Sequence, residues 1–456
     1  MSSTLRRRVL GPAAAIGALS LVLAGCAADT EEPGAGGAGG DADCAEYEQY
    51  GSFDGETVEI FSTIAEVEAD NLELSWADFA SCTGITIDYV SSQEFETQIN
   101  VRAQAGDAPE LAIIPQPGLL QRLIAEGYVV AAPDSVEANV DEFWSESWKS
   151  YGTVDGEFYA APLMASVKGY VWYSPADFEE NGYEVPATWD EMMALTEEMA
   201  ANGADNAAYR PWCVGFASGD ATGWVGTDWV EDAVLRFAGP EAYDQWVAGD
   251  LTFASPEITE AIELVGDILL DPAYVNGGFG GAESIVSTTF QDGGFPILEG
   301  NCSMHHQASF YEAQWGEDVT VAPDGDIWAF LTPPAAEGDP FAVTGGGEFV
   351  AAFSEDEATA AVQTYLSSDL WANNRVALGG VISANQGLDA SLASSELAVQ
   401  SIEILQDPDT IFRFDASDLM PAAVGAGSFW TGMTDWVLGE LTTDQMTAFI
   451  DGTFPR

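Results

Sequence analysis

Short apolar, β-branched runs alternate with more polar stretches in the first quarter of the chain. The runs at 57–61, 84–90 and 109–114 are typical of strands. The stretches after residue 63 to about 80 and from about 93 to 105 indicate helices. A strand–helix–strand–helix–strand order predicts a parallel sheet with helices on both faces.

The same α/β alternation continues downstream. Thr188 and Glu191 have the spacing of a capping box and predict the start of a helix. Three glycines at 345–347 precede a further apolar run. The remaining predicted elements are a helix at 224–238 and strands at 212–217, 300–306, 326–331 and 348–353. Because single cores stop growing at about 250–300 residues, a chain of 456 residues predicts two lobes.

The ends of the first strands supply the first candidate site residues. Ser62 and Thr63 follow the first predicted strand, and Gln116 follows the third. Ligands of open α/β sheets bind at the carboxyl ends of the strands. We therefore expect these three side chains to face a ligand cleft.

The N-terminus is typical of an export signal. Three arginines at 6–8 precede an apolar stretch at 9–23, which is shorter than the about 20 residues of a membrane span. The sequence Leu-Ala-Gly-Cys at 23–26 resembles a bacterial lipoprotein box, so we predict removal of residues 1–25 and lipidation of Cys26. Residues 26–54, acidic and rich in glycine, are interpreted as a tether. This predicts a lipid-anchored domain on the extracellular face of the cytoplasmic membrane; export by the general or the twin-arginine route stays open.

The charge of the chain restricts its partners. With 12 basic and 75 acidic residues the formal net charge is −63, and removing three arginines with residues 1–25 makes it −66. Such a surface repels phosphate backbones and anionic headgroups, which excludes nucleic acid as a partner. The acidity reflects either capture of cationic ligands or a generally acidic, salt-tolerant proteome. Its spread along the whole chain favours the second explanation.

Several motifs carry a resemblance to a known family. They are the lipobox, Pro-Ala-Thr-Trp-Asp-Glu at 186–191, Ala-Thr-Gly-Trp at 221–224 with Thr-Asp-Trp at 227–229, the segment 302–310 with the glycines 345–347, and 412–421. Together they resemble extracellular solute-binding proteins of ABC importers, and among these the maltose-type and α-glucoside-type carbohydrate binders.

The resemblance implies the periplasmic-binding-protein-like fold of type II, in which two α/β lobes close on one solute by a hinge. The chain would cross between lobes near Ser166, Leu331 and Gly379. Lobe I would comprise 55–165 with 330–378, and lobe II 166–329 with 379–456. The family further implies a monomer that hands its solute to a membrane permease and does no chemistry on it.

Cysteine pairing follows from this layout. Besides Cys26 the chain has four cysteines, an even number in an exported protein, and three pairings are possible. We favour Cys44–Cys82 and Cys213–Cys302, because each pair lies within one predicted lobe. Metal ligation is disfavoured, because no CxxC spacing is present.

Tryptophans are the strongest candidates for contact with a sugar. A pyranose presents apolar faces, which stack on aromatic rings, and a rim of hydroxyls. Trp224 and Trp430 are flanked by glycine and polar residues, and Trp430 best matches the aromatic platform of maltose-type binders. Trp172, in an apolar strand, and Trp189, at a capped helix start, are expected in the core.

Polar candidates complete the predicted site. Lys168, one of two lysines, lies at the first predicted hinge. Asp415 is interpreted as a structural partner of Arg413, and Glu348 faces either the cleft or solvent. The predicted sugar-binding residues are Thr63, Gln116, Lys168, Trp224, Asp228, Gln307, Gly346, Gly347, Asp418 and Trp430.

Other function classes make different predictions. A polyamine or oligopeptide receptor fits the acidity, and a secreted glycosidase would also hold aromatic residues and acids in a cleft. A metal receptor would use His305 and His306, but neighbours on a strand point to opposite faces. We expect a carbohydrate receptor for an α-glucoside or glucosyl disaccharide, with no cofactor and no metal.

Overall fold

The computed structural model describes residues 44–276, 281–316, 318–407 and 409–455. The predicted signal peptide, Cys26 and the tether up to residue 43 lie outside these ranges. Within them, no helix is both long and apolar enough to span a membrane.

The first sheet confirms the predicted parallel start of the chain. Within the described residues its strand order is β13-β12-β3-β1-β2, with β6 also paired to β12. The bounds are β1 Thr57–Ser62, β2 Thr86–Ser91, β3 Leu111–Ile114, β6 Ala160–Val167, β12 Ala342–Ala352 and β13 Ile411–Phe414. β1 runs parallel to β2 and β3, whereas β12 is antiparallel to β3 and β6. All four residues of β3 are buried, as expected for a central strand.

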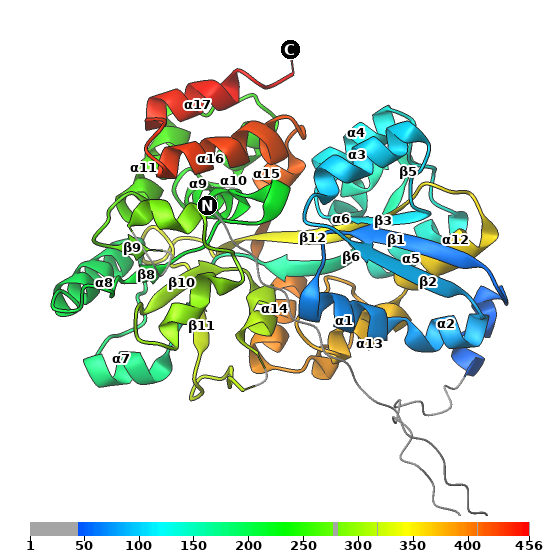
Figure 1. Cartoon of the computed structure of the whole chain (residues 1–456), viewed down its shortest axis with the longest axis horizontal. Helices are drawn as coiled ribbons and strands as arrows, with labels where there is room; N and C mark the ends of the chain where they lie inside the picture. Colours follow the sequence, from blue (N-terminus) through cyan, green and yellow to red (C-terminus); the bar gives the residue numbers. More distant parts are fainter. Residues whose placement is uncertain (1–43, 277–280, 317, 408, 456) are drawn as a thin grey trace, which may run out of the picture. The chain divides into compact units, whose positions relative to one another are not determined.

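Helices cover both faces of this sheet, α3 and α4 on one side and α1, α2 and α13 on the other (Figure 1). They connect the strands along the chain and comprise α1 Glu66–Ser75, α2 Ala77–Thr83, α3 Phe95–Ala105, α4 Pro117–Ala125, α5 Asp134–Phe143, α6 Glu146–Tyr151, α12 Glu357–Leu366, α13 Asp369–Ala377 and α14 Glu396–Gln406. A small hairpin of β4 Thr153–Val154 and β5 Glu157–Phe158 precedes β6. Pro117 occupies the first turn of α4, where its fixed φ suits a helix start and places Gln116 at the N-cap.

Residues 44–54, which the sequence assigns to the tether, are folded onto this part of the protein. Tyr47 and Tyr50 are buried and pack edge-on against Phe79 and Tyr365. The favoured disulfide between Cys44 and Cys82 is present, with Cα atoms 5.4 Å apart. Aromatic packing and the covalent bond therefore extend the folded domain to its first described residue.

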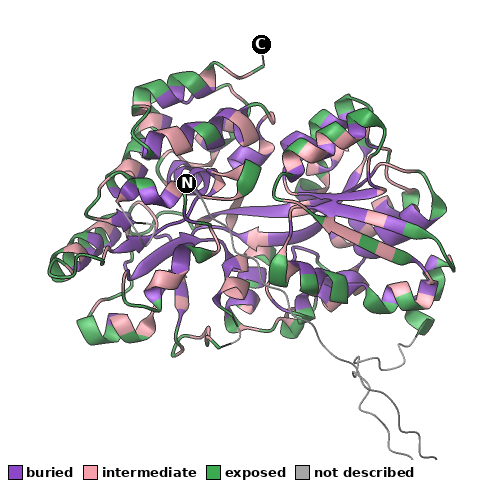
Figure 2. Cartoon of the chain, viewed as in Figure 1, coloured by how far each residue is buried: buried purple, intermediate pink, exposed green. Residues whose placement is uncertain are grey.

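The second sheet has the order β11-β7-β10-β8-β9. Its strands are β7 Tyr170–Tyr173, β8 Trp212–Cys213, β9 Val275–Asn276, β10 Met304–Gln307 and β11 Trp328–Leu331. β8 is shorter than the predicted strand at 212–217, because its pairing extends over two residues before the chain turns away. Most strands of both sheets carry buried residues, whereas the edge strand β2 carries only intermediate and exposed ones (Figure 2). Trp172 and Trp189 are in the core, as predicted.

The helices of this second part are α7 Pro175–Asn181, α8 Trp189–Asn202, α9 Trp224–Phe237, α10 Pro240–Val247, α11 Pro256–Leu269, α15 Ala416–Leu419, α16 Trp430–Val437 and α17 Thr443–Asp451. Thr188 caps α8 as predicted, while the Glu191 carboxylate accepts from the backbone N–H of Ala187 rather than from that of Thr188. Every residue from 225 to 235 of α9 is buried, including three acids. Because buried carboxylates need partners, the neighbours of α9 must supply cations or N–H donors.

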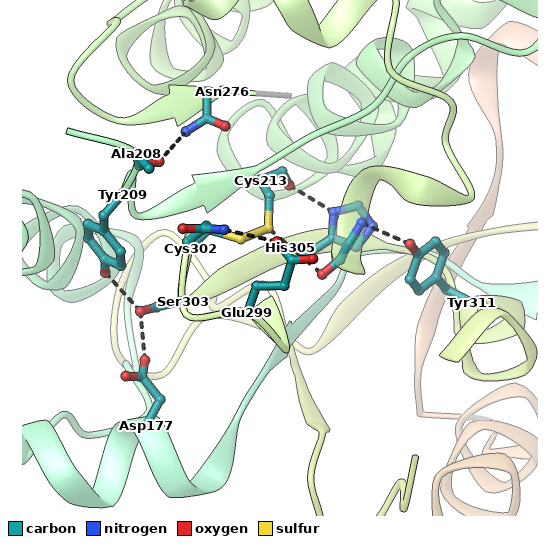
Figure 3. The surroundings of a disulfide bond; sticks show 12 residues. Asp177, Ala208, Tyr209, Cys213, Asn276, Glu299, Cys302, Ser303, His305 and Tyr311 are labelled. Atoms are coloured by element: carbon teal, nitrogen blue, oxygen red, sulfur yellow. Dashed lines mark hydrogen bonds between the residues drawn. A yellow bond between two sulfur atoms is a disulfide. The ribbon is translucent and has the colours of Figure 1, made fainter. Parts of the chain in front are cut away.

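The second disulfide joins Cys213 of β8 to Cys302, just before β10, as the sequence favoured (Figure 3). Beside it, His305 Nδ1 lies 2.8 Å from the carbonyl oxygen of Cys213, and burial lowers the pKa of His305 to about 4. His306 contacts Asp232 instead, at 3.2 Å. The two histidines thus have separate partners, as the alternation of a strand requires.

In the described strand order the chain passes from the first sheet to the second between β6 and β7 and returns between β11 and β12. Beyond Gly379 the chain still pairs with the first sheet, because Ile382 bridges to Ala165 and β13 pairs with β12. The helices after β13 pack in the core of the second sheet. The predicted crossings and lobe boundaries stay a prediction.

Gly169 is required at the first crossing. Its φ of +78° lies in the left-handed region, and a Cβ there would approach Asp232 Oδ2 to 2.2 Å. Asp232 also accepts from Thr344 Oγ1 of β12 at 2.7 Å and pairs with Arg236 at 2.7 Å. A larger residue at 169 would therefore disturb the contact between α9 and β12.

Candidate functional site

A cavity of about 190 Å³ is lined by strand residues of the first sheet and by loops that follow strands of both sheets. Eight of the ten predicted sugar-binding residues line it: Thr63, Gln116, Lys168, Trp224, Gly346, Gly347, Asp418 and Trp430. Segments separated by more than 300 residues thus meet here, and the strand-end expectation for Thr63 and Gln116 agrees with their position. Ser62 is not part of the wall; it is buried and its Oγ accepts from the N–H of Ile64.

Aromatic rings form one part of the wall. Trp224, the first residue of α9, lies 5.3 Å from Phe290 and 6.1 Å from Phe310 between ring centroids. Trp430 is 3 % exposed, and among the described residues its Nε1 has no hydrogen-bond partner. Gly223, with φ +113°, brings the start of α9 against Trp430, since a Cβ there would lie 2.2 Å from the Trp430 carbonyl oxygen. The two predicted tryptophans are therefore held near each other by backbone packing.

Gln116 presents free hydrogen-bonding capacity to the cavity. Its Nε2 donates to Glu96 Oε1 at 3.1 Å. Gln116 Oε1 and Glu96 Oε2 are both buried and have no partner within the described part of the chain. Burial raises the pKa of Glu96 above its usual range. Gln116 and Glu96 both line the cavity, each with one oxygen left without a partner, and Glu96 is a residue that the sequence analysis missed.

Lys168 lies between β6 and β7, buried among carboxylates. Its Nζ donates to Asp228 Oδ1 at 2.8 Å and also to Asp415. Burial acts to lower the pKa of Lys168, but the charges of Asp228 and Asp415, followed by Asp418 and Glu231, outweigh it and hold the pKa well above its usual range. Lys168 is consequently a permanent cation whose hydrogen bonds serve its neighbours, and its Nζ lies 5.4 Å from the centroid of Trp224.

Asp228 does not reach the cavity wall. It lies behind Lys168, 2 % exposed. The prediction for Asp415 is also corrected: Arg413 pairs with Asp244, at 2.6 and 2.9 Å, and Asp415 with Lys168. β13 ends at Phe414, so Asp415 turns inward to cap α15.

Three acids of this cluster have the composition of a metal site. Oxygens of Asp228, Glu231 and Asp415 lie within 4.8 Å of one another. Lys168 already binds two of these carboxylates, and Glu231 accepts from the N–H groups of Ala416 and Ser417 at 3.0 and 3.1 Å. The ammonium group of Lys168 and the two backbone N–H groups thus already bind the carboxylates that a metal ion would need as ligands.

Gln307 also lies outside the wall. It ends β10, is 1 % exposed, and its Oε1 accepts from the N–H of Ala308 at 2.8 Å. The chain turns after it, so Phe310 lines the cavity in its place.

Gly346 and Gly347 lie inside β12 rather than ahead of a strand. They pair with Ser166 and Ala165 of β6. A Cβ on Gly347 would come within 2.5 Å of the Met164 carbonyl oxygen. These glycines permit two strands to approach closely beside the cavity, and the strand carries Glu348 into the wall.

A second charged group lies in the wall; Glu68 and Arg375 were missed from the sequence, whereas Glu348 was left open between the cleft and solvent. Glu68 of α1, Glu348 of β12 and Arg375 of α13 all line the cavity. Burial, reinforced for Glu68 by the charge of Glu348, raises the pKa of each carboxyl to about 7. Burial lowers the pKa of Arg375 to about 10. Glu68 and Arg375 belong to helices whose polar residues resemble a solvated face, so no sequence signal marks them.

Two lobes joined by several crossings, with a cavity lined from both, define a two-lobe binding protein. The family of bacterial extracellular solute-binding proteins matches residues 65–369. The chain belongs to this family.

Curated relatives match over nearly their whole length. The chain is 36 % identical to the osmoprotective compounds-binding protein GgtB of Synechocystis, over 89 % of this chain and 94 % of that protein. It is 35 % identical to the alpha-glucosides-binding periplasmic protein AglE of Rhizobium meliloti, over 88 % and 87 %. The solved structure of the bacterial solute receptor AcbH matches with a TM-score of 0.72 at 17 % identity, over 87 % of this chain and 97 % of that one. The last match concerns the fold, which is the type II periplasmic-binding-protein fold.

Proposed function

We propose that this protein is the receptor of an ABC importer that binds an α-glucoside or a glucosyl disaccharide and delivers it to a permease. The observation that carries the proposal is the composition of the cavity wall. Trp224 and Trp430 supply apolar surface, and the unpartnered oxygens of Gln116 and Glu96 supply acceptors. A pyranose requires this combination, because its C–H faces stack on rings while its hydroxyls donate.

The relatives support the sugar class. The name of AglE specifies alpha-glucosides and that of GgtB specifies osmoprotective compounds. A neutral ligand also suits a wall in which Lys168 is already neutralised by Asp228 and Asp415.

Calorimetric titration with maltose, trehalose, sucrose and isomaltulose tests the proposal. We expect saturable binding of at least one sugar. Trp224→Ala and Trp430→Ala should each weaken it about tenfold or more, because each removes buried aromatic contact surface. Phe449→Ala, at an exposed position of α17, is the matched control and should bind like the parent protein. Unchanged affinity in both tryptophan variants would remove this site assignment.

A polyamine receptor is the second candidate, favoured by the acidity of the wall. Glu66, Glu68, Glu96, Glu348, Asp415 and Asp418 line the cavity, against Lys168 and Arg375. Spermidine and a mixed peptide pool belong in the same titrations. Binding of spermidine alone would replace the sugar proposal by this one.

Binding without turnover distinguishes the receptor from a glycosidase. A glycosidase needs two carboxyl groups about 5–5.5 or 6.5–9.5 Å apart around a scissile bond. Incubation with aryl-glucosides and maltose should release no product. Hydrolysis that is lost in Glu68→Gln or Glu348→Gln would contradict a receptor-only role.

The proposal includes the predicted signal peptide and lipid anchor. Cys26→Ala should release the exported protein from the membrane fraction into the medium, and the parent protein should stay with the membrane. Equal release of both proteins would contradict anchoring at Cys26. Size-exclusion chromatography with light scattering tests the expected monomer.

A further inference from the structure

Arg375 is a buried cation whose hydrogen-bonding capacity is only partly used. Its side chain is 1 % exposed and lines the cavity. Nη1 donates to the carbonyl oxygen of Gly379 at 2.8 Å, whereas Nε has no partner among the described residues. A buried, unpaired donor costs free energy unless something in the cavity accepts from it.

Two carboxylates share this part of the wall without closing on the guanidinium. Glu68 accepts from Gln314 Nε2 at 3.1 Å, and Glu348 follows the paired glycines of β12. The negative charges of both carboxylates act to raise the pKa of Arg375. Within the described ranges, however, no carboxylate oxygen lies within 4.0 Å of a nitrogen of Arg375. The arrangement thus leaves a gap bordered by one donor group and two acceptor groups.

A hydroxyl group matches such a gap. It donates one hydrogen bond and accepts others, so it can bridge a carboxylate and a guanidinium at once. An ammonium group donates only and would meet the like charge of Arg375. A carboxylate or phosphate accepts only and would meet the like charges of Glu68 and Glu348.

We propose that Glu68, Glu348 and Arg375 form a hydroxyl-binding subsite that determines ligand specificity within the cavity. The proposal rests on the proposed sugar function and deepens it by naming the residues that select neutral, hydroxyl-rich ligands. The guanidinium group of Arg375 donates a hydrogen bond to a sugar hydroxyl oxygen, and the same hydroxyl group donates a hydrogen bond to Glu68 or Glu348.

Monodeoxy analogues of the sugar that binds best test the subsite. In the parent protein, at least one analogue should bind about tenfold to a hundredfold more weakly than the sugar, because a hydrogen bond to a charged group is lost. In Glu348→Gln, Glu68→Gln and Arg375→Gln, the sugar itself should bind more weakly, and the ratio between sugar and that analogue should approach one. Arg375→Lys, which keeps the charge and lacks the planar guanidinium group, should not restore the ratio.

Matched controls separate binding from folding. Glu73→Gln on the exposed face of α1 and Arg122→Gln on α4 change the same residue types outside the wall and should keep the parent ratio. Circular dichroism identifies any variant that fails to fold. If the Arg375 variants do not fold, the sugar-to-analogue ratio of Glu348→Gln, which preserves the shape of the side chain, decides whether the subsite exists.

The outcomes are distinguishable. If the parent protein binds sugar and the ratio is unchanged in all three wall variants, the subsite is wrong and the proposed function stands. If the parent protein binds no sugar and binds spermidine, both proposals fall.

Discussion

Two buried cations border the same cavity, and they differ in what surrounds them. Lys168 is in direct contact with Asp228 and Asp415, and Asp415 also accepts from Ser417 Oγ and from the N–H of Asp418. Arg375 has one backbone partner, and its nearby carboxylates stand apart. A satisfied ion cluster stabilises the fold, whereas an unsatisfied one retains capacity for a ligand. Charge and burial alone therefore do not identify a binding residue. The number of its donor and acceptor atoms that have no partner in the protein is the better guide.

Removing the cation from the cluster around Lys168 should have the largest effect on stability. Lys168→Met should lower the free energy of unfolding by about 3–5 kcal/mol, because it leaves buried carboxylates without their cation. Denaturant titration measures this change. The other lysine is the matched control: Lys149 contacts the exposed acids Glu137 and Asp141, so Lys149→Met should cost less than about 1 kcal/mol. Equal losses for the two lysines would contradict the comparison.

A smaller effect concerns pH and the unsatisfied cluster. Glu68 and Glu348 have folded-state pKa values of about 7, raised from 4.5. The folded protein therefore binds protons more tightly there than the unfolded chain, and this contribution to stability is present below pH 4.5 and lost as the pH rises through about 7. Each group adds a slope of at most about 1.4 kcal/mol per pH unit in that window.

Denaturant titrations at pH 5, 6, 7 and 8 check this expectation. The parent protein should lose more stability across the series than the double variant Glu68→Gln/Glu348→Gln, because the other acids are common to both. Parallel pH profiles would show that the two carboxyls titrate normally.

The smallest expected effect on stability is that of Arg375→Gln. It removes the hydrogen bond to Gly379 but also a poorly compensated buried charge, so the free energy of unfolding should fall by about 1 kcal/mol. Ligand affinity should fall more than stability does, the reverse of Lys168→Met. A loss of stability equal to that of Lys168→Met would place Arg375 in a structural role.

Much of the fold was predictable because its signals are local. The β-branched runs of β1 and β2 and the cap at Thr188 indicated elements that the structure contains. The pairing of β13 with β12 was not predictable, because it joins residues about 70 positions apart and nothing in the sequence near Gly379 indicates it.

The candidate site was predictable where a residue stands out from its neighbours. Trp224 and Trp430 were marked by glycines, and Lys168 by rarity. Glu68 and Arg375 were missed because a carboxylate among 75 acids, or an arginine in a polar helix, has no distinguishing context before folding. Asp228 and Gln307 do not line the cavity. Their positions on α9 and β10 were identified from the sequence, but Asp228 pairs with Lys168, and Gln307 Oε1 accepts from the N–H of Ala308.

The disulfide at Cys44 has a mechanical consequence. Force applied to the chain at residue 44 passes through the sulfur bridge into α2, at Cys82, and bypasses residues 45–81. Without the bridge, a steady force would first detach Tyr47 and Tyr50 from the core and then separate β1 from its neighbouring strands. The released chain would extend by up to about 3.3–3.6 Å per residue. With the bridge, the same force acts on α2 at Cys82, and the segment from 45 to 81, which contains β1, is not extended.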